Sequence, residues 1–348
     1  MRTLKSLKVF SCCAFGIALA FSFVGCGDDS SSTSAPDQTP TSSSGALLPD
    51  AGTTPANSSG SLPDAGTNPA SSPDAADPTS SAIVPPANGS FTFATTPGTL
   101  ALAPDEDGFY DMGDVYKAVP QTSKIAFVIR HSKREKNNLG TESKLTPIGI
   151  QMAQTLGAKL VGEESFYYAS TDFIRTRETC KNIAVGRGEA DAEVVTWDGI
   201  DGGYFLTVPT DTLDALVSTR GGNQKYIAQY AYGAPFTNAT VAATIPGYFY
   251  DLFERGNQFV NEVIVANMPG WKRVSVLASH DMLVEPLIAF VSNRTIDLKF
   301  YQTPFRWVNY LSGIAVIVDE AGAVTALPVR GDSVGWMRPA DEVEETVQ

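Results

Sequence analysis

The sequence predicts an α/β fold: a three-layer sandwich in which helices flank a mostly parallel central sheet, with an insertion over one rim of that sheet. The prediction comes from two apolar runs, residues 124–130 and 272–278, which are rich in β-branched side chains and are typical of buried strands. The chain has 348 residues but two histidines, His131 and His280, and each follows shortly after one of these runs. If the two strands are parallel neighbours, both imidazoles lie at the rim where such folds bind ligands.

The first helix after this region has a clear start. Thr146 is a suitable N-cap and Pro147 suits the first helical position. Ile148, Met152 and Leu156 then recur at helical spacing, so we expect this stripe to face the sheet.

Further strands and helices follow along the chain. Residues 204–246 are irregular and rich in glycine and tyrosine, and we expect them to form the rim insertion that shapes substrate access. The other predicted elements are strands at 166–169 and 193–197, a helix opening at 170–179, helices at 248–267 and 286–292, and a closing hairpin at 314–318 and 324–329.

The first 25 residues have the pattern of a signal peptide. Arg2, Lys5 and Lys8 precede an apolar stretch, residues 9–24, which is short for a membrane span. Residues 23–26 resemble a bacterial lipobox, which implies cleavage before Cys26 and attachment of lipid to it. An uncleaved signal anchor and an ordinary signal peptide cut elsewhere are the alternatives.

Residues 26–90 are composed mainly of Ser, Thr, Pro, Asp, Ala and Gly, and the hexapeptide at 48–53 recurs at 62–67. Too few large apolar side chains are present to offset the entropy lost on ordering, so we expect a disordered tether. A flexible chain of this length reaches roughly 40–50 Å. The folded domain is therefore expected at 91–348, held at a distance from a membrane.

The cysteines indicate a fold without disulfide bonds. Cys12 and Cys13 lie in the predicted signal peptide, and Cys26 would carry the lipid. Cys180 alone remains, and a single cysteine cannot form an internal bridge. Its position in a helical pattern predicts a buried core residue.

The charge distribution argues against a nucleic-acid partner. The formal net charge of −13 comes mostly from residues 27–116, which hold twelve acids and no lysine or arginine. The remaining domain is only mildly acidic, and a nucleic-acid footprint needs a basic face. With two histidines in the chain, a catalytic zinc site with three protein ligands is also disfavoured, and we expect no metal or other cofactor.

Three short motifs carry a resemblance to a known family. Residues 130–134 resemble the Arg-His-Gly-x-Arg signature of the histidine phosphatase superfamily, and residues 279–281 resemble the His-Asp motif of its acid phosphatase branch. Leu145, Thr146 and Gly149 match a Leu-Thr-x-x-Gly element. The resemblance covers roughly residues 120–330. Ser132 departs from the usual glycine, and serine resists backbone dihedrals that glycine tolerates.

The resemblance also implies roles for individual side chains. His131 would be the nucleophile that forms a phosphohistidine, and His280 would bind the phosphoryl oxygens. The phosphate-binding cations would be Arg130, Arg134 and Arg175.

Arg175 is chosen over Arg177 by the Asp-x-x-Arg-x-x-x-Thr spacing of the family segment. The alternative for Arg175 is a surface arginine paired with Glu178 at i,i+3.

The proton donor has more than one candidate. Asp281 is preferred because it adjoins His280, and a donor held protonated near cations needs a raised pKa, with an acidic activity optimum. Alternatively, Asp281 caps the turn before the helix at 286–292. As a further alternative, the donor is Asp198 or Asp201 in the loop at 198–201, as in relatives with a distant carboxylate.

These observations together predict an exported, lipid-anchored phosphomonoesterase that acts on a small phosphate ester outside the cytoplasm. The predicted partners are the phosphorylated substrate and, through the N-terminal lipid, a membrane. The alternatives are an inactive binding lipoprotein on the same fold and a phosphomutase-like relative.

Overall fold

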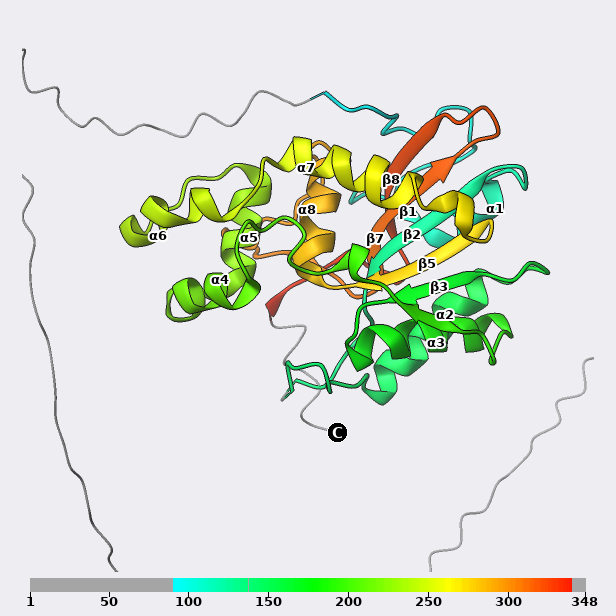
Figure 1. The fold of residues 1–348 in the computed structure, drawn as a ribbon, viewed down its shortest axis with the longest axis horizontal. Helices are drawn as coiled ribbons and strands as arrows, with labels where there is room; N and C mark the ends of the chain where they lie inside the picture. Colours follow the sequence, from blue (N-terminus) through cyan, green and yellow to red (C-terminus); the bar gives the residue numbers. More distant parts are fainter. Residues whose placement is uncertain (1–89, 137, 340–348) are drawn as a thin grey trace, which may run out of the picture. The chain divides into compact units, whose positions relative to one another are not determined.

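The computed structural model describes residues 90–136 and 138–339 (Figure 1). The predicted signal peptide, Cys26 and all but the last residue of the predicted tether lie outside the described residues. Among the residues that are described, no helix is long and apolar enough to cross a lipid bilayer.

A seven-stranded sheet forms the centre of the domain, in the order β1-β8-β7-β2-β5-β3-β4. β2, β5, β3 and β4 run parallel to one another and β1 is parallel to β8, whereas β7 is antiparallel to both β2 and β8. The mostly parallel α/β sheet expected from the sequence is thus confirmed. The strands are β1 Tyr110–Asp111, β2 Lys124–Arg130, β3 Tyr167–Ser170, β4 Val194–Thr196, β5 Val274–Ser279, β7 Ser312–Val318 and β8 Val324–Arg330; β6 Trp307–Val308 and β9 Trp336–Met337 form a separate pair.

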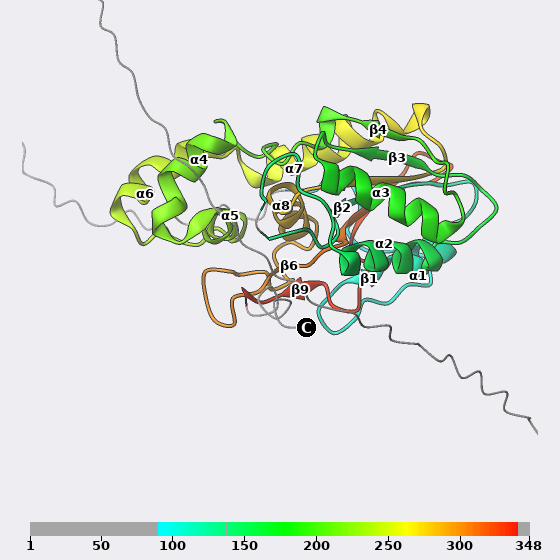
Figure 2. The same cartoon turned by 90° about the horizontal axis from the view of Figure 1, so that it is seen from below.

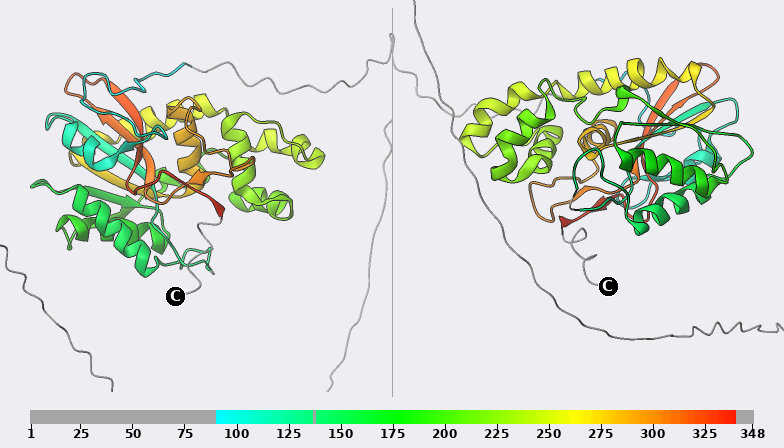
Figure 3. Two further views of the ribbon diagram at one scale, coloured as in Figure 1. Left: turned by 180° about the vertical axis from the view of Figure 1, so that it is seen from behind. Right: turned by 60° about the horizontal axis from the view of Figure 1, so that its bottom comes forward.

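Helices cover both faces of this sheet. α1, α2 and α3 lie on one face, and α7 and α8 lie on the other (Figure 2). α4, α5 and α6 form a group at one end of the sheet, beside α8 (Figure 3). The helices are α1 Met112–Ala118, α2 Pro147–Lys159, α3 Ile174–Arg187, α4 Thr210–Val217, α5 Gly222–Tyr232, α6 Ala239–Thr244, α7 Leu252–Gln258, which continues as a π-helix over Phe259–Val265, and α8 Asp281–Val291.

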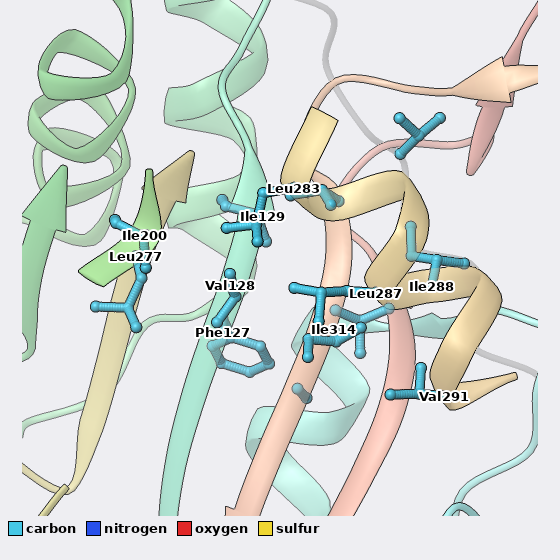
Figure 4. Packing of buried hydrophobic residues seen from close by; sticks show 14 of the residues in the cluster. Phe127, Val128, Ile129, Ile200, Leu277, Leu283, Leu287, Ile288, Val291 and Ile314 are labelled. Atoms are coloured by element: carbon cyan, nitrogen blue, oxygen red, sulfur yellow. The ribbon is translucent and has the colours of Figure 1, made fainter. Parts of the chain in front are cut away.

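The core between the sheet and α8 is made of branched aliphatic side chains. Ile129 of β2 and Ile314 of β7 lie next to Leu283 and Leu287 of α8 (Figure 4). All four side chains are fully buried. Each such side chain contributes about 1.5–3 kcal/mol when taken from water, so this layer anchors α8, and with it His280, to the central strands.

Two expectations about helices were wrong. Residues 204–246 are largely helical. Their helices are short and are separated at Gly221 and Gly233, both with positive φ, so they leave too little periodicity to detect. α8 begins at Asp281 and contains Pro286, where a start near Pro286 was expected. Proline removes one backbone hydrogen bond, a loss that tertiary packing of the buried residues 283–291 of this helix outweighs.

α2 begins as predicted, with the Thr146 hydroxyl accepting a hydrogen bond from the Gly149 N–H at 3.0 Å. The expected apolar stripe is wrong at its start, because Ile148 is 47% exposed. Gly149, Ala153, Leu156 and Gly157 form the buried face instead. Small residues in this face allow α2 to pack unusually close to α3.

Two glycines determine how close these helices come. A Cβ atom on Gly157 of α2 would lie 2.1 Å from the Ile183 carbonyl oxygen of α3. A Cβ atom on Gly186 of α3 would lie 2.0 Å from the Gln154 carbonyl oxygen of α2. Real side chains cannot approach backbone oxygens this closely, so both positions require glycine.

Cys180 of α3 is a fully buried free cysteine, which confirms the expected core position. Its thiol donates to the Ala169 carbonyl oxygen at 3.2 Å, and burial raises its pKa to about 12. Such a thiol stays protonated and is a poor nucleophile.

Replacement of Gly157 by alanine should destabilise the domain. Alanine is the better helix former by about 1 kcal/mol, but overpacking against Ile183 costs about 1–3 kcal/mol, and backbone atoms cannot move aside easily. The midpoint of thermal unfolding should therefore fall by several degrees. Gly247→Ala is the matched control, because no atom lies within 4 Å of the added Cβ. Equal melting temperatures for both variants would contradict the close packing.

Candidate active site

The two histidines lie at the carboxyl ends of neighbouring parallel strands. In the β2–β5 pairing Arg130 is opposite Ser279, and the backbone N–H of His131 donates to the Ser279 carbonyl oxygen at 2.9 Å. This register brings the His131 and His280 rings to a centroid separation of 5.7 Å. The predicted meeting of both imidazoles at one rim is confirmed.

The hydrogen bonds of His131 determine which of its nitrogens is reactive. Nδ1 lies 2.7 Å from the Ser132 carbonyl oxygen, which can only accept, so Nδ1 carries the proton and Nε2 keeps its lone pair. Burial lowers the pKa of His131 well below its usual value, and the charges of Arg130 and Arg175 lower it further. The ring is thus a neutral imidazole with a nucleophilic Nε2.

His280 is fixed by contacts to both ring nitrogens. Nδ1 lies 3.3 Å from Nη2 of Arg175, which can only donate, so Nε2 carries the proton and donates to the Thr171 hydroxyl at 3.0 Å. Burial and the Arg175 charge lower its pKa to about 3, against the opposite effect of Asp281. His280 is therefore also neutral in the unliganded site.

Arg175 is a pocket residue and not a surface arginine. Its side chain is buried, its Nη1 donates to the carbonyl oxygens of Leu139 and Gly140, and its guanidinium carbon lies 4.1 Å from the centre of the Phe173 ring. Burial, followed by the charge of Arg134, lowers its pKa to about 10, so it remains charged at neutral pH.

The alternative reading of Arg175, a pair with Glu178, does not occur. The Glu178 carboxylate accepts from the Leu145 N–H at 2.7 Å. Arg177 reaches outward and donates to the Thr196 hydroxyl at 3.2 Å.

Arg130 and Arg134 lie in different surroundings. Arg134 lines the cavity beside His131, and its Nη1 donates to the Glu135 carbonyl oxygen. Arg130 is fully buried and is not among the residues that line the cavity. Its Nη1 donates to the Val308 carbonyl oxygen at 2.6 Å, and its Nη2 is paired with Asp281 at 3.1 Å.

Asp281 is the first residue of α8, and it does not have the raised pKa expected of a proton donor. Burial raises the pKa of this carboxyl group, but the Arg130 guanidinium and the Trp307 indole N–H, at 3.1 Å from Oδ2, lower it by more. The net pKa is below the usual value. Asp281 is therefore ionised in the unliganded site, because charge-assisted hydrogen bonds favour the carboxylate over the acid.

Ser132, which stands where the family has glycine, is accommodated without backbone strain. It is not among the described non-glycine residues with positive φ. Its N–H donates to the Thr179 hydroxyl at 2.9 Å, and its own hydroxyl donates to the Gly149 carbonyl oxygen at 2.7 Å. A Cβ atom on Gly149 would lie 2.0 Å from the Lys133 carbonyl oxygen, so the close approach here requires glycine in α2.

A cavity of about 680 Å³ opens over the two histidines. Asp201 lines it, whereas Asp198 is exposed and is not among its lining residues. The cavity contains basic residues on the strand side and acidic or amide residues on the insertion side. Its charged and amide lining is His131, Arg134, Arg175, His280 and Asp281, and, from residues 201–224, Asp201, Asp211, Asp214, Asn223 and Gln224.

The contribution of α4 and α5 to this cavity was not predicted from the sequence. Asp211 and Asp214 are three residues apart in a short helix that follows Pro209, and this spacing was the available signal. Without the tertiary fold, however, nothing in the sequence places these helices against the rim. Within the described residues, no group of three His, Cys, Asp or Glu side chains is arranged to hold a metal ion.

Comparison with known proteins supports the same family as the motifs. Residues 126–298 match the family described as histidine phosphatase superfamily (branch 1). No curated protein sequence matches the chain.

Several solved structures are similar to this chain. A phosphoglycerate mutase from Bacillus anthracis is 18% identical, with a TM-score of 0.39, over 61% of this chain and 94% of that one. Bacillus stearothermophilus YhfR is 18% identical, with a TM-score of 0.38, over 61% and 98%. A phosphoserine phosphatase from Entamoeba histolytica is 19% identical, with a TM-score of 0.36, over 58% and 94%. Likenesses this distant say nothing about the reaction.

The neutral state of His280 predicts a specific pH dependence of stability. In the unfolded chain this histidine binds a proton below about pH 6.5, whereas in the folded protein its pKa is about 3. Between these values the unfolded state binds more protons, so the free energy of unfolding should rise with pH, by up to about 1.4 kcal/mol per unit for one imidazole.

Urea unfolding from about pH 4 to about pH 8 measures this slope. The wild-type slope between about pH 4 and pH 6 should exceed that of His280→Gln by about 1 kcal/mol per pH unit, and the two slopes should converge above about pH 7. His131 contributes to the pH dependence of the free energy of unfolding in both proteins, so its contribution cancels when the two slopes are compared. Parallel curves across the whole range would show that His280 is not held neutral.

Proposed function

We propose that this protein is a phosphomonoesterase that works through a phosphohistidine on His131, because residues 126–298 match the histidine phosphatase superfamily. The observation that supports this most strongly is the hydrogen bond from His131 Nδ1 to the Ser132 carbonyl oxygen. It holds the ring in the tautomer with an unprotonated Nε2, at a cavity lined by Arg134 and Arg175. Activation of a neutral nitrogen nucleophile beside cations is what attack on a phosphate dianion requires.

The proposed reaction has two steps. In the first, the His131 Nε2 lone pair forms a bond to phosphorus, and the bond from phosphorus to the ester oxygen breaks as that oxygen receives a proton. In the second, water attacks the phosphohistidine, which releases inorganic phosphate and restores neutral His131. Arg134 and Arg175 neutralise the charge on the phosphoryl oxygens in both steps.

His280 and Arg130 have less direct roles in this proposal. A bound dianion raises the pKa of a neighbouring imidazole, so His280 can gain a proton and donate to phosphate. Arg130 adds positive charge from behind the histidines. To touch the phosphate itself, Arg130 would have to exchange its contact with Asp281 for one with a phosphoryl oxygen.

Asp281 remains our first candidate for the proton donor. It lines the cavity next to His280, and the arrival of a phosphate dianion would offset the Arg130 charge that keeps its pKa low. Asp201 is the alternative, because it also lines the cavity. Asp198 is disfavoured by its position outside the cavity lining.

We further propose that the protein is exported and anchored by lipid on Cys26, at the periplasmic or cell-surface face of a bacterial membrane. This rests on the signal-peptide pattern, on the lipobox-like residues 23–26 and on the repetitive polar stretch that follows. The substrate would then be an extracytoplasmic phosphate ester.

The nucleophile can be tested by trapping. Enzyme quenched after brief exposure to labelled phosphate ester should carry acid-labile, base-stable phosphate on His131. His131→Ala should bind phosphate but lose label and turnover, by at least about a thousandfold. Arg177→Ala, which alters an arginine outside the pocket, should keep both. An unlabelled wild type that binds the ester without turnover would favour the inactive binding protein, and transfer of phosphate to a second hydroxyl would favour a mutase.

The proton donor can be identified through the leaving group. Asp281→Asn should slow alkyl phosphates by about a hundredfold or more, but nitrophenyl phosphate much less, because an activated leaving group needs little protonation. Asp201→Asn is the comparison. If that variant shows the leaving-group dependence and Asp281→Asn slows both esters equally, the donor is Asp201.

The anchor has its own test in the intact bacterium. Cys26→Ser should abolish palmitate labelling and release an active, soluble domain, because no other cysteine in the chain follows the lipobox pattern. Cys180→Ser, which alters the buried cysteine, should leave labelling unchanged. Labelling that persists in Cys26→Ser would be evidence against the anchor.

A further inference from the structure

We propose that the cavity selects phosphate esters whose leaving group carries a positively charged amine, with Asp214 of α4 as the residue that recognises this cation. The inference rests on the proposed phosphomonoesterase function and specifies its substrate class. It comes from the position of Asp214, from the unbalanced charge on the insertion side of the cavity, and from the direction in which a leaving group must point.

A short chain of contacts ties Asp214 to the catalytic rim. Its Oδ1 accepts from the Asn223 side-chain amide of α5 at 3.1 Å, and the same amide nitrogen lies 3.9 Å from the Met282 sulfur, next to Asp281. The loop just before the insertion is also close to the histidine, because a Cβ atom on Gly202 would lie 3.3 Å from the His280 Cβ. The Asn223 side chain therefore links Asp214 to Met282 at the start of α8.

In the part of the chain that the structure describes, the carboxylates on this side of the cavity form no ion pair. Within the described residues, no ion pair joins Asp201, Asp211 or Asp214 to a lysine or arginine. The nearby cations face elsewhere: Lys225 lies over the Tyr226 ring, and Arg220 donates to the Leu216 carbonyl oxygen. A cation supplied by a ligand would meet uncompensated negative charge here.

The surroundings of Asp214 favour it over the other two carboxylates as the group that binds a ligand cation. Asp201 and Asp211 are exposed, whereas Asp214 is half-buried. Burial raises its pKa, and the charge of Asp211 adds to the rise, against the Asn223 hydrogen bond. A ligand ammonium group would relieve both unfavourable effects, and charge attraction is larger where water is partly excluded.

The geometry of phosphoryl transfer directs the leaving group toward this side. The attacking and leaving atoms lie in line through phosphorus, so a leaving group opposite His131 points away from the strand ends and toward the insertion. The cavity of about 680 Å³ has room for a small organic group beyond the phosphate. A second phosphate at that end would meet three carboxylates, which disfavours polyphosphorylated substrates.

The experiment compares two esters that differ in one group. O-phosphoethanolamine ends in an ammonium group, and ethylene glycol monophosphate ends in a hydroxyl of similar size. For the wild type, kcat/KM should favour the ammonium ester by about tenfold at low salt, and the preference should shrink as salt screens the attraction. Asp214→Asn, which keeps the shape and the Asn223 contact, should bring the ratio near one without a comparable loss on the hydroxyl ester.

Asp191→Asn is the control for net charge, because Asp191 is exposed in the turn between α3 and β4 and is absent from the cavity lining. It should keep the wild-type ratio. A wild-type ratio near one, or equal losses on both esters in Asp214→Asn, would overturn the inference. If Asp214→Asn does not fold, a wild-type ratio near one, or a preference that salt does not reduce, still overturns the inference. Hydrolysis of nitrophenyl phosphate distinguishes failure of the proposed function from failure of this inference. If the wild type does not hydrolyse it, the proposed function itself is wrong.

Discussion

The candidate site depends on the parallel pairing of β2 with β5. The hydrogen bond from the His131 N–H to the Ser279 carbonyl oxygen continues this pairing one residue beyond the strand, so that two residues 149 positions apart in the chain present their rings to each other. A register shift of one residue would turn one imidazole to the opposite face of the sheet. The buried layer of β2, β7 and α8 holds this register, since any slip would expose several fully buried aliphatic side chains.

Around this pairing, burial and positive charge act together on the imidazoles. Both lower the pKa of His131 and of His280, so the rings stay neutral although a charged histidine would otherwise be common near neutral pH. The same cations make Asp281 a carboxylate. The unliganded site thus suits an anion, because it combines the neutral His131 nucleophile with the charged side chains of Arg134 and Arg175. A bound dianion would change the protonation of both His280 and Asp281.

The insertion supplies most of the acidic and amide side chains that line the cavity. α4 and α5 bring carboxylate and amide groups over a rim whose own residues are mainly basic, and Asn223 links these helices to the start of α8. If the proposed function holds, the reaction and the choice of substrate are carried by different parts of the chain, because His131 follows a strand of the central sheet whereas Asp214 lies in α4.

The sequence by itself determined the α/β class, the two strands that the histidines follow and the capped start of α2, and its resemblance to a known family favoured Arg175 over Arg177. These follow from local patterns: apolar runs, a Thr-Pro cap and residue spacing act over a few positions. Only the tertiary structure decided that Arg130 pairs with Asp281, that the pKa of Asp281 is lowered, and that the 204–246 segment forms helices facing the histidines. A pKa depends on which charges and how much water surround a group, and those neighbours come from distant parts of the chain. The sequence names the groups that can react, whereas the fold decides their protonation and what faces them.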